Sequence, residues 1–268
     1  MTNPTAPAEH LLLLAADFTR HNDALTRIRL TDSSPATALT QQIGLTQHLA
    51  DSALHIVDVL NAQPMYHSHA IYTVYARVKQ LAQLTTDAAD HLLNAVDILD
   101  HARDGIPLQD EGPLLTHQQA VGEAASRLAL ARNLTALGTR DAFATAELFV
   151  TERRRRGVHP THQQPALSHI QDAALRAVAQ GEVTISGGKP DIRSNAVRVS
   201  ITTIRSLESR GLVTREPCLL RLRDERVHLT SDGYRGLAAA FGRPQAPDLT
   251  AARPATSLSA KTARTATR

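Results

Sequence analysis

Histidine and aspartate occur at helical spacing in several places and could ligate a metal ion. The chain has 13 histidines, and residues 87–91 and 97–104 place carboxylates and imidazoles on successive helical turns. Helical di-iron sites use Glu-x-x-His motifs and zinc proteases use His-Glu-x-x-His, and residues 1–156 contain neither. Gly187-Gly188-Lys189 lacks the remainder of a phosphate-binding loop, and no G-x-S-x-G motif occurs. We therefore expect no metal site, no cofactor and no catalytic residue, and we place these acidic and imidazole groups on solvated helix faces.

The segment Val197–Val213 has a different chemistry. Val199, Ile204 and Leu207 fall close to one stripe of a helix that Gly211 would end. Hydroxyl and guanidinium groups occupy the other side, and we predict contacts from Arg198, Ser200, Thr202, Thr203, Arg205 and Ser206. Such groups bind phosphates and base edges, with Arg205 the best candidate for a guanine edge. An ordinary surface helix would have the same pattern, so the neighbouring segments must decide.

The neighbours of this segment predict a small α+β unit. Residues 166–180 have the spacing of a compact helix, and residues 182–185 can form a short strand. Residues 186–195, SGGKPDIRSN, are loop-like. Residues 218–223 and 226–229 alternate around Asp224-Glu225 as a hairpin does, and Thr230 can cap a last helix that runs to Phe241.

This order of elements resembles the winged-helix DNA-binding domains of bacterial regulators, in MarR-like and related families. Two motifs carry the resemblance: V-S-x-x-T-I-x-x-L-x-x-R-G-L-V at Val199–Val213 and L-T-x-x-G-Y at Leu229–Tyr234. It implies that the first motif is the recognition helix and its exit into the wing. It also implies that the wing arginines Arg221, Arg223 and Arg226 meet phosphates or the minor groove. The family has a helix where this chain has residues 186–195, so base-specific reading stays open.

The net charge of +3 conceals two halves of opposite sign. Residues 1–150 carry 9 Lys+Arg and 16 Asp+Glu, whereas residues 151–268 carry 20 and 10. A basic half suits a polyanionic partner. Further phosphate contacts are expected from Arg153, Arg154, Arg155, Arg156, Lys189 and Arg193. The four consecutive arginines could equally be a solvated helix end that complements the helix dipole.

Long helices dominate the first half of the chain. Apolar residues at 3-4 spacing predict helices over about 7–30, 35–61, 70–104 and 116–155, with a break near Gly138-Thr139 in the last. The chain has no Trp and one cysteine, Cys218, which excludes an internal disulfide. No apolar run approaches the roughly 18 residues of a membrane span.

The sequence thus predicts a mainly α protein: an elongated bundle of about four long helices followed by a C-terminal α+β winged-helix domain. The expected boundaries are a disordered 1–8, a helical bundle at 9–156, a linker at 157–165, the winged helix at 166–242 and a disordered basic tail at 243–268. We expect a cytoplasmic, nucleoid-associated, non-enzymatic homodimer that binds double-stranded DNA and regulates transcription. In this interpretation the bundle dimerises or senses a protein partner or effector. The alternative is a scaffold protein in which the winged helix only docks another protein.

Overall fold

Helices and a small sheet make up the described part of the chain. The computed structural model describes residues 6–32, 34–63, 67–108, 114–158, 167–192, 199–218 and 224–243. The first five helices are α1 (Pro7–Arg27), α2 (Pro35–Asn61), α3 (His69–Asp104), α4 (His117–Thr135) and α5 (Gly138–Arg155). They are followed by α6 (His169–Ala179), β1 (Val183–Ser186), β2 (Lys189–Ile192), α7 (Ile201–Ser209), β3 (Val213–Pro217), β4 (Glu225–Leu229) and α8 (Ser231–Ala240). The expected helical region with a C-terminal α+β part is confirmed.

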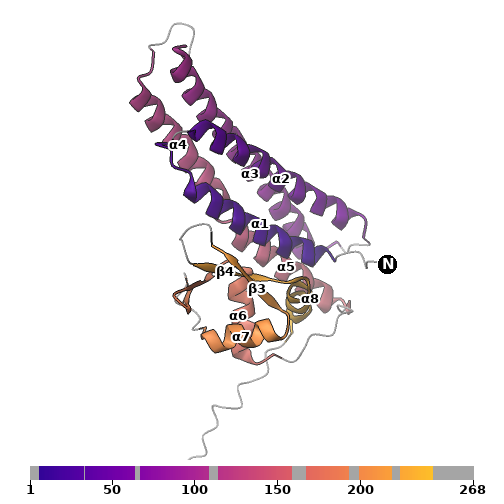
Figure 1. Ribbon diagram of the computed structural model, residues 1–268. Coiled ribbons are helices and arrows are strands. Elements are labelled where there is room, and N and C mark those ends of the chain that lie inside the picture. The colour runs from indigo at the N-terminus through magenta and orange to yellow at the C-terminus, as the bar shows by residue number, and fades with distance from the viewer. Residues whose placement is uncertain are drawn as a thin grey trace, which may run out of the picture.

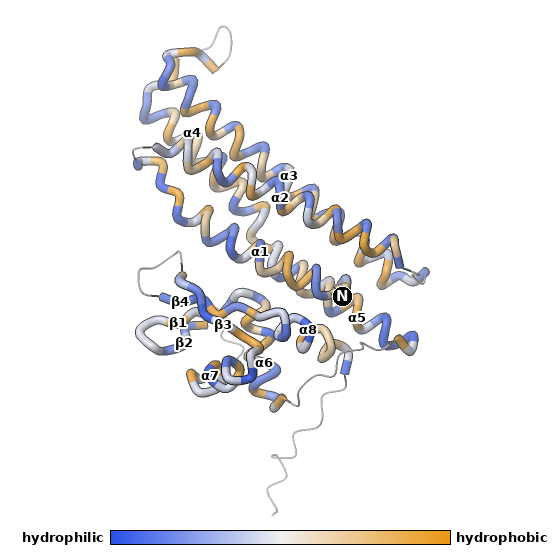
Figure 2. Tube along the Cα trace, turned by 45° about the vertical axis from the view of Figure 1, so that its right-hand side comes forward, coloured by the Kyte–Doolittle hydropathy of each residue, from blue (hydrophilic) through white to orange (hydrophobic). Residues whose placement is uncertain are grey.

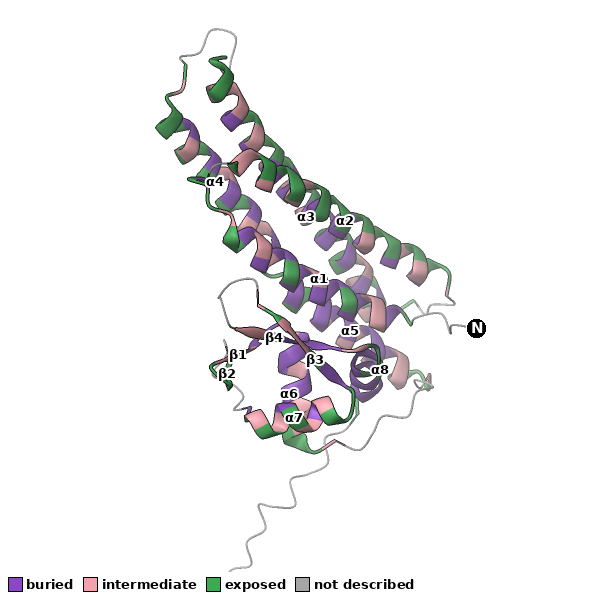
Figure 3. Cartoon of the chain, in the orientation of Figure 1, coloured by how far each residue is buried: buried purple, intermediate pink, exposed green. Residues whose placement is uncertain are grey.

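The helices α1 to α5 lie side by side (Figure 1). Their hydrophobic and hydrophilic residues alternate along each helix, and the buried residues lie on the sides that face one another (Figures 2 and 3). The predicted bounds of α2 and α3 match the structure closely. Two signals explain the clear start and end of α3: the Ser68 hydroxyl accepts from the Ile71 amide, and Gly105 ends the helix with φ of 68°.

The predicted break in the fourth helix separates α4 from α5 at residues 136–137. Gly138 lies there against the Phe18 ring of α1, and a Cβ on this glycine would lie 2.3 Å from a ring carbon. The glycine therefore lets α1 and α5 approach closely at the point where the fourth helix is interrupted.

The sheet corrects two predictions. Its order is β2-β1-β4-β3, with all pairs antiparallel. Lys189–Ile192, predicted as loop, is strand β2, because Gly187 and Gly188 both have positive φ, as a two-residue hairpin turn requires. On the side of β4 away from β1, its partner is 213–217, since Val213 lies opposite Leu229 and Pro217 opposite Glu225. Of the strand that we predicted at 218–223, Cys218 follows the end of β3 and residues 219–223 lie outside the described residues.

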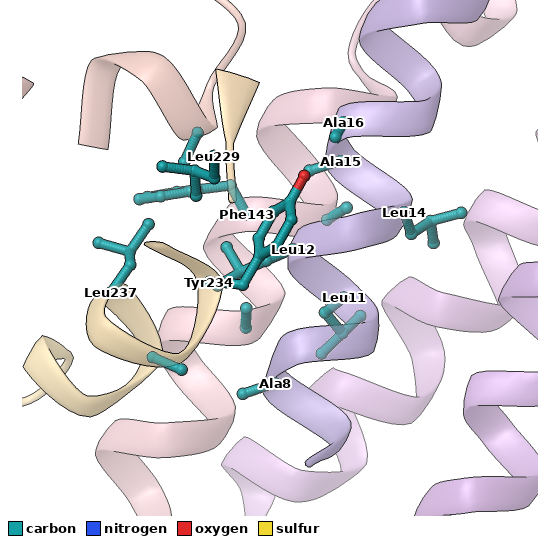
Figure 4. Close-up of a cluster of buried hydrophobic side chains, with 14 of the residues drawn as sticks. Ala8, Leu11, Leu12, Leu14, Ala15, Ala16, Phe143, Leu229, Tyr234 and Leu237 are labelled. Carbon is teal, nitrogen blue, oxygen red and sulfur yellow. The ribbon is translucent and has the colours of Figure 1, made fainter. Parts of the chain in front are cut away.

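The helical and α+β parts share one hydrophobic core. On the side of α1 that faces the α+β part, Leu12 and Ala15 lie close to Tyr234, Leu229 and Leu237 (Figure 4). Leu14, on the opposite side of α1, points toward the other helices. The first helix of the chain thus completes the core of the last elements. The predicted linker residues 159–165 lie outside the described residues.

A buried ion pair also joins α1 to the sheet. The Arg226 guanidinium of β4 contacts the Asp23 carboxylate of α1, with Nε–Oδ2 at 2.6 Å and Nη2–Oδ1 at 2.8 Å. Nη1 also donates to the Gly181 carbonyl at 2.6 Å. Both side chains are buried. Arg226, expected on the wing surface, is therefore a structural residue in the interior.

A second polar layer continues along the same contact. Arg20 of α1 lies 3.1 Å from Asp17 and 3.6 Å from Glu216 of β3, and Glu216 lies 3.4 Å from the His228 ring of β4. Burial, with a smaller effect of the nearby Arg20, lowers the pKa of His228 to about 4. Burial likewise lowers the pKa of His21 to about 4, where its Nε2 lies 3.3 Å from the Thr46 hydroxyl of α2. Both imidazoles are therefore neutral at pH 7.

Within the described ranges, no helix has both the length and the apolar character needed to cross a membrane.

We expect Asp23→Ala to lower the free energy of unfolding by about 3–5 kcal/mol, because it leaves the Arg226 charge buried without its partner. Urea denaturation measures this. Asp232→Ala is the control, because Asp232 pairs with Arg235 at 2.8 Å on the surface, where a pair contributes about 1 kcal/mol or less. The double change Asp23→Leu and Arg226→Met should recover most of the loss. Equal effects of the two single changes would contradict a structural role for the buried pair.

The neutral histidines make stability depend on pH. Their folded pKa lies below the unfolded value of 6.5, so the unfolded state binds protons more readily and stability falls as pH drops from about 6.5 to 4. We expect a loss of a few kcal/mol in urea denaturation across this window, at roughly 1.4 kcal/mol for each pKa unit. His228→Gln should flatten the curve, and His117→Gln, which changes an exposed histidine, should not.

Candidate nucleic-acid interface

The helix α7 is shorter than predicted, and its first turn explains the difference. The Ser200 hydroxyl accepts from the Thr203 amide at 3.1 Å, so Ser200 is the N-cap and not a residue of the helix. Ile204 and Leu207 are fully buried and hold the apolar side of α7 against the core. The helix lies on the side of the α+β part that faces away from α1 to α4 (Figure 1).

Polar groups gather on the outer side of α7. Thr202 and Arg205 are exposed, and Thr203 is half-buried. The Ser200 hydroxyl lies 2.7 Å from that of Thr202 and 2.9 Å from that of Thr203. Three hydroxyls therefore lie together at the N-terminus of α7, one turn away from the guanidinium of Arg205. A helix N-terminus and neutral hydroxyls can bind phosphate oxygens, and arginine can bind a base edge.

Gln171 of α6 holds the middle of α7. Its Nε2 donates to the Ser206 hydroxyl at 2.9 Å. Its Oε1 accepts from the Ser168 amide at 3.0 Å, within the capping box that begins α6. Ser206, which we predicted as a contact residue, is therefore half-buried and hydrogen-bonded within the fold. Of the contact residues that we predicted within α7, Thr202 and Arg205 are exposed.

Arg215 of β3 holds the C-terminal end of α7. Its Nε and Nη2 donate to the two Glu208 oxygens at 2.5 and 2.8 Å, and its Nη1 lies 3.4 Å from Glu225 of β4. The hydrogen bond to Glu208 raises the pKa of Arg215. Glu208 belongs to α7, whereas Arg215 and Glu225 belong to β3 and β4. These contacts therefore fix α7 relative to the β3–β4 pair. Gln171 and Arg215 together hold the middle and the C-terminal end of α7.

The four arginines at the end of α5 contact their own surroundings. Arg153 lies over the Phe149 ring at 5.5 Å and donates to the Gln63 side chain at 2.7 Å. Arg154 donates to the Ala239 carbonyl at the end of α8 at 2.5 Å, and burial lowers its pKa. Arg155 and Arg156 are exposed and lie 4.0 and 3.5 Å from Glu152. Their expected role in phosphate binding stays a prediction, with the last two the more accessible.

The remaining predicted residues divide into three groups. Lys189 is exposed beside the turn of the β1–β2 hairpin. Arg193, Arg198, Arg221 and Arg223 lie outside the described residues. Arg226, buried against Asp23, does not belong to the surface.

The basic charge is not carried by the described α+β residues. Between 167 and 243 these residues include eight Lys+Arg and eight Asp+Glu, so their formal charge is zero. The positive excess of the C-terminal half belongs to residues 153–156, to Arg193, Arg198, Arg221 and Arg223, and to the segment after 243. Any electrostatic attraction to a polyanion would therefore depend on these four arginines, the end of α5 and the C-terminal segment.

Gln171 and Arg215 are functional candidates that we did not predict from the sequence. Ser168-x-x-Gln171 is a capping-box pattern and marks a helix start, but nothing in it points to Ser206. Arg215 precedes Glu216 within a strand, where charge alternation suggests an exposed side chain. The partner residues are 35 and 7 positions away, so only the packing of α7 brings them together.

We expect Gln171→Ala and Arg215→Ala to loosen α7 without unfolding the protein. Each removes one side of the support, and a partly exposed interaction of this kind contributes about 1 kcal/mol. Amide hydrogen exchange should be faster in α7 by about fivefold, with α3 unchanged. Arg235→Ala, on the surface of α8, is the matched control and should leave α7 as in the parent protein.

The described site therefore consists of the exposed face of α7, the residues that hold it, and Lys189 on the neighbouring hairpin. Within the described ranges, no three His, Cys, Asp or Glu side chains are placed to hold one metal ion. No protein-family model matches the chain, and comparison with curated proteins and with solved structures also gives no match.

Proposed function

We propose that this protein binds double-stranded DNA through α7 and regulates transcription. The observation that carries the proposal is the exposed polar face of α7, with Thr202 and Arg205 on the outside of the molecule and the helix held by Gln171 and Arg215. In this proposal the hydroxyls of Ser200, Thr202 and Thr203 bind backbone phosphate, and Arg205 reaches a base edge in the major groove.

The topology of the α+β part supports a winged-helix interpretation. Helix α6, strand β1, helix α7 and the β3–β4 pair follow in that order, and β1 lies beside β4 in the sheet. Winged-helix domains have this arrangement, and β3 and β4 would form the wing. The β1–β2 hairpin stands where these domains have a second helix, so Lys189 on that hairpin becomes a candidate phosphate contact in its place.

The sequence positions of the four arginines that lie outside the described residues also support the proposal. Arg193 and Arg198 precede α7 in the chain, and Arg221 and Arg223 belong to the connection between β3 and β4. In a winged helix these two segments flank the recognition helix and form the wing tip. Phosphate contacts by these side chains would make affinity fall steeply with salt.

For the helices α1 to α5 we propose a role in homodimerisation or in binding a protein partner. Large apolar side chains are exposed on their outer faces, among them Leu45 and Leu54 of α2, Leu93 of α3 and Leu130 of α4. A dimer would place two copies of α7 on one duplex, as symmetric DNA-binding proteins do.

A scaffold protein is the second candidate. The zero formal charge of the described α+β residues favours it, because a DNA-binding surface normally carries a positive excess. In that case the exposed face of α7 would dock another protein.

Fluorescence anisotropy with a random 30-base-pair duplex tests the proposal. We expect binding by the full chain that weakens at least tenfold between 50 and 200 mM salt, since several phosphate contacts release counterions. Arg205→Ala should weaken binding about tenfold, as the loss of one good base or phosphate contact does.

Arg235→Ala removes the same charge from the exposed surface of α8 and should change little. Unchanged binding by Arg205→Ala would exclude α7 as the DNA-contacting element. No binding by the intact chain at 50 mM salt would favour the scaffold role.

A further inference from the structure

A groove of about 340 Å³ lies between α1 and α2. Its floor is apolar, because Leu14 of α1 and Ile56 of α2 line it and are both buried. We propose that a second copy of this chain binds in this groove: the two α2 helices pack antiparallel, and Leu45 of each copy enters the groove of the other. This inference rests on the homodimerisation proposed above, and it specifies the interface and its symmetry.

Helix α2 has a projecting apolar side chain and a recess on the same side. Leu45 is 52% exposed, although it is a large apolar residue. Ser52 lies about two turns or 10 Å further along the helix, so the two side chains point to the same side. Ser52 lines the groove with a small side chain. The recess beside it is therefore accessible to a side chain of another molecule.

This projection and this recess match each other under a twofold rotation. In a symmetric dimer, the contact between two different residues occurs twice, once in each direction. An axis that passes halfway between Leu45 and Ser52 brings each Leu45 over the groove of the other copy, so both exposed leucines become covered. An unrelated partner would have to supply an apolar side chain for the groove and a separate recess for Leu45. A second copy has both.

The charges of α2 select the antiparallel orientation. Residues 33–50 contain no Asp, Glu, Lys or Arg, whereas Asp51 and Asp58 follow in the second half of the helix and are exposed. In the antiparallel pair, the carboxylates of each copy lie against the uncharged half of the other. A parallel pair would set Asp51 beside Asp51 and Asp58 beside Asp58, and like charges in an interface oppose association. The uncharged stretch therefore lets a copy of the same net charge approach an otherwise acidic helical region.

The arrangement is compatible with DNA binding by both copies. Helix α1 lies between α2 and the α+β part (Figures 1 and 2). A twofold axis that runs from α2 toward α1 reverses the direction of α2 and leaves both α+β parts on the same side of the dimer. Two copies of α7 can therefore face one duplex.

Sedimentation equilibrium of the full chain at micromolar concentrations tests the interface. We expect a reversible dimer, and Leu45→Gln should raise its dissociation constant at least tenfold, because the change removes two buried leucines from each dimer. Leu54→Gln is the matched control, since Leu54 is 51% exposed but lies two and a half turns from Leu45, on the opposite side of α2. It should leave the dissociation constant unchanged.

Ser52→Phe separates insertion into the groove from general apolar adhesion. The phenyl ring fills the recess and adds exposed apolar surface. We expect it to weaken the dimer at least tenfold, because Leu45 of the other copy no longer fits. A tighter dimer would overturn the proposal.

Disulfide crosslinking tests the antiparallel register in the Cys218→Ser background. Chains carrying Leu45→Cys, mixed with chains carrying Ser52→Cys, should form a disulfide between the two kinds of chain. The same mixture with Leu54→Cys in place of Leu45→Cys should not.

The outcomes distinguish this interface from the proposals on which it rests. A parent chain that stays monomeric would contradict both the homodimer and the interface. A parent dimer that neither Leu45→Gln nor Ser52→Phe weakens would overturn the interface alone and place the subunit contact elsewhere. DNA binding is measured separately, because loss of the anisotropy signal in Arg205→Ala leaves the sedimentation result unchanged.

Discussion

The buried contact between Asp23 and Arg226 is the constraint on which the rest of this structure depends. A charge removed from water is tolerated only with a partner and further hydrogen bonds, and here the carboxylate of the first helix and the Gly181 carbonyl provide both. The pair fixes the position along α1 at which β4 packs. Because β4 lies between β1 and β3 in the sheet, its position also determines where the other strands lie relative to α1.

The position of α7 follows from the same frame. Strand β4 pairs with β3, and Arg215 of β3 holds the C-terminal end of α7. Helix α6 packs on the sheet, and its residue Gln171 holds the middle of α7. The exposed hydroxyls and Arg205 are thus presented by a chain of contacts that begins in the N-terminal helix. A signal received by the helical part would have a physical route to α7 through these contacts, although the two regions are far apart in sequence.

Local patterns were sufficient for much of the fold. The 3-4 spacing in residues 70–104 and the Thr230 cap are properties of neighbouring residues, and the corresponding helices begin and end close to where we predicted them. The Leu-Thr-x-x-Gly motif also has a local cause. The Thr230 amide donates to the Leu212 carbonyl, and a Cβ on Gly233 would collide with that same oxygen, so the glycine is needed for α8 to begin there.

The errors arose where a distant partner decides the outcome. The alternating pattern led us to predict 218–223 as the strand that forms the hairpin with β4, whereas residues 213–217 form that pair in the structure. Arg226 resembled a wing arginine because its partner, Asp23, lies 203 positions earlier. Of the candidate site, the exposure of Thr202 and Arg205 followed from helical periodicity, whereas the internal bond of Ser206 and the support from Arg215 could not be predicted without the packing of α6 and β3.

The shared core also has a consequence for biosynthesis. Helix α1 leaves the ribosome long before Tyr234 and Leu237, the residues that cover the side of it carrying Leu12 and Ala15. During translation this apolar surface lacks these native neighbours until the chain has been made as far as α8, and exposed apolar surfaces of this kind promote aggregation. A chain cut short before α8 would keep this apolar strip exposed, so premature termination at any point ahead of α8 would yield an aggregation-prone helical fragment and not a smaller working protein.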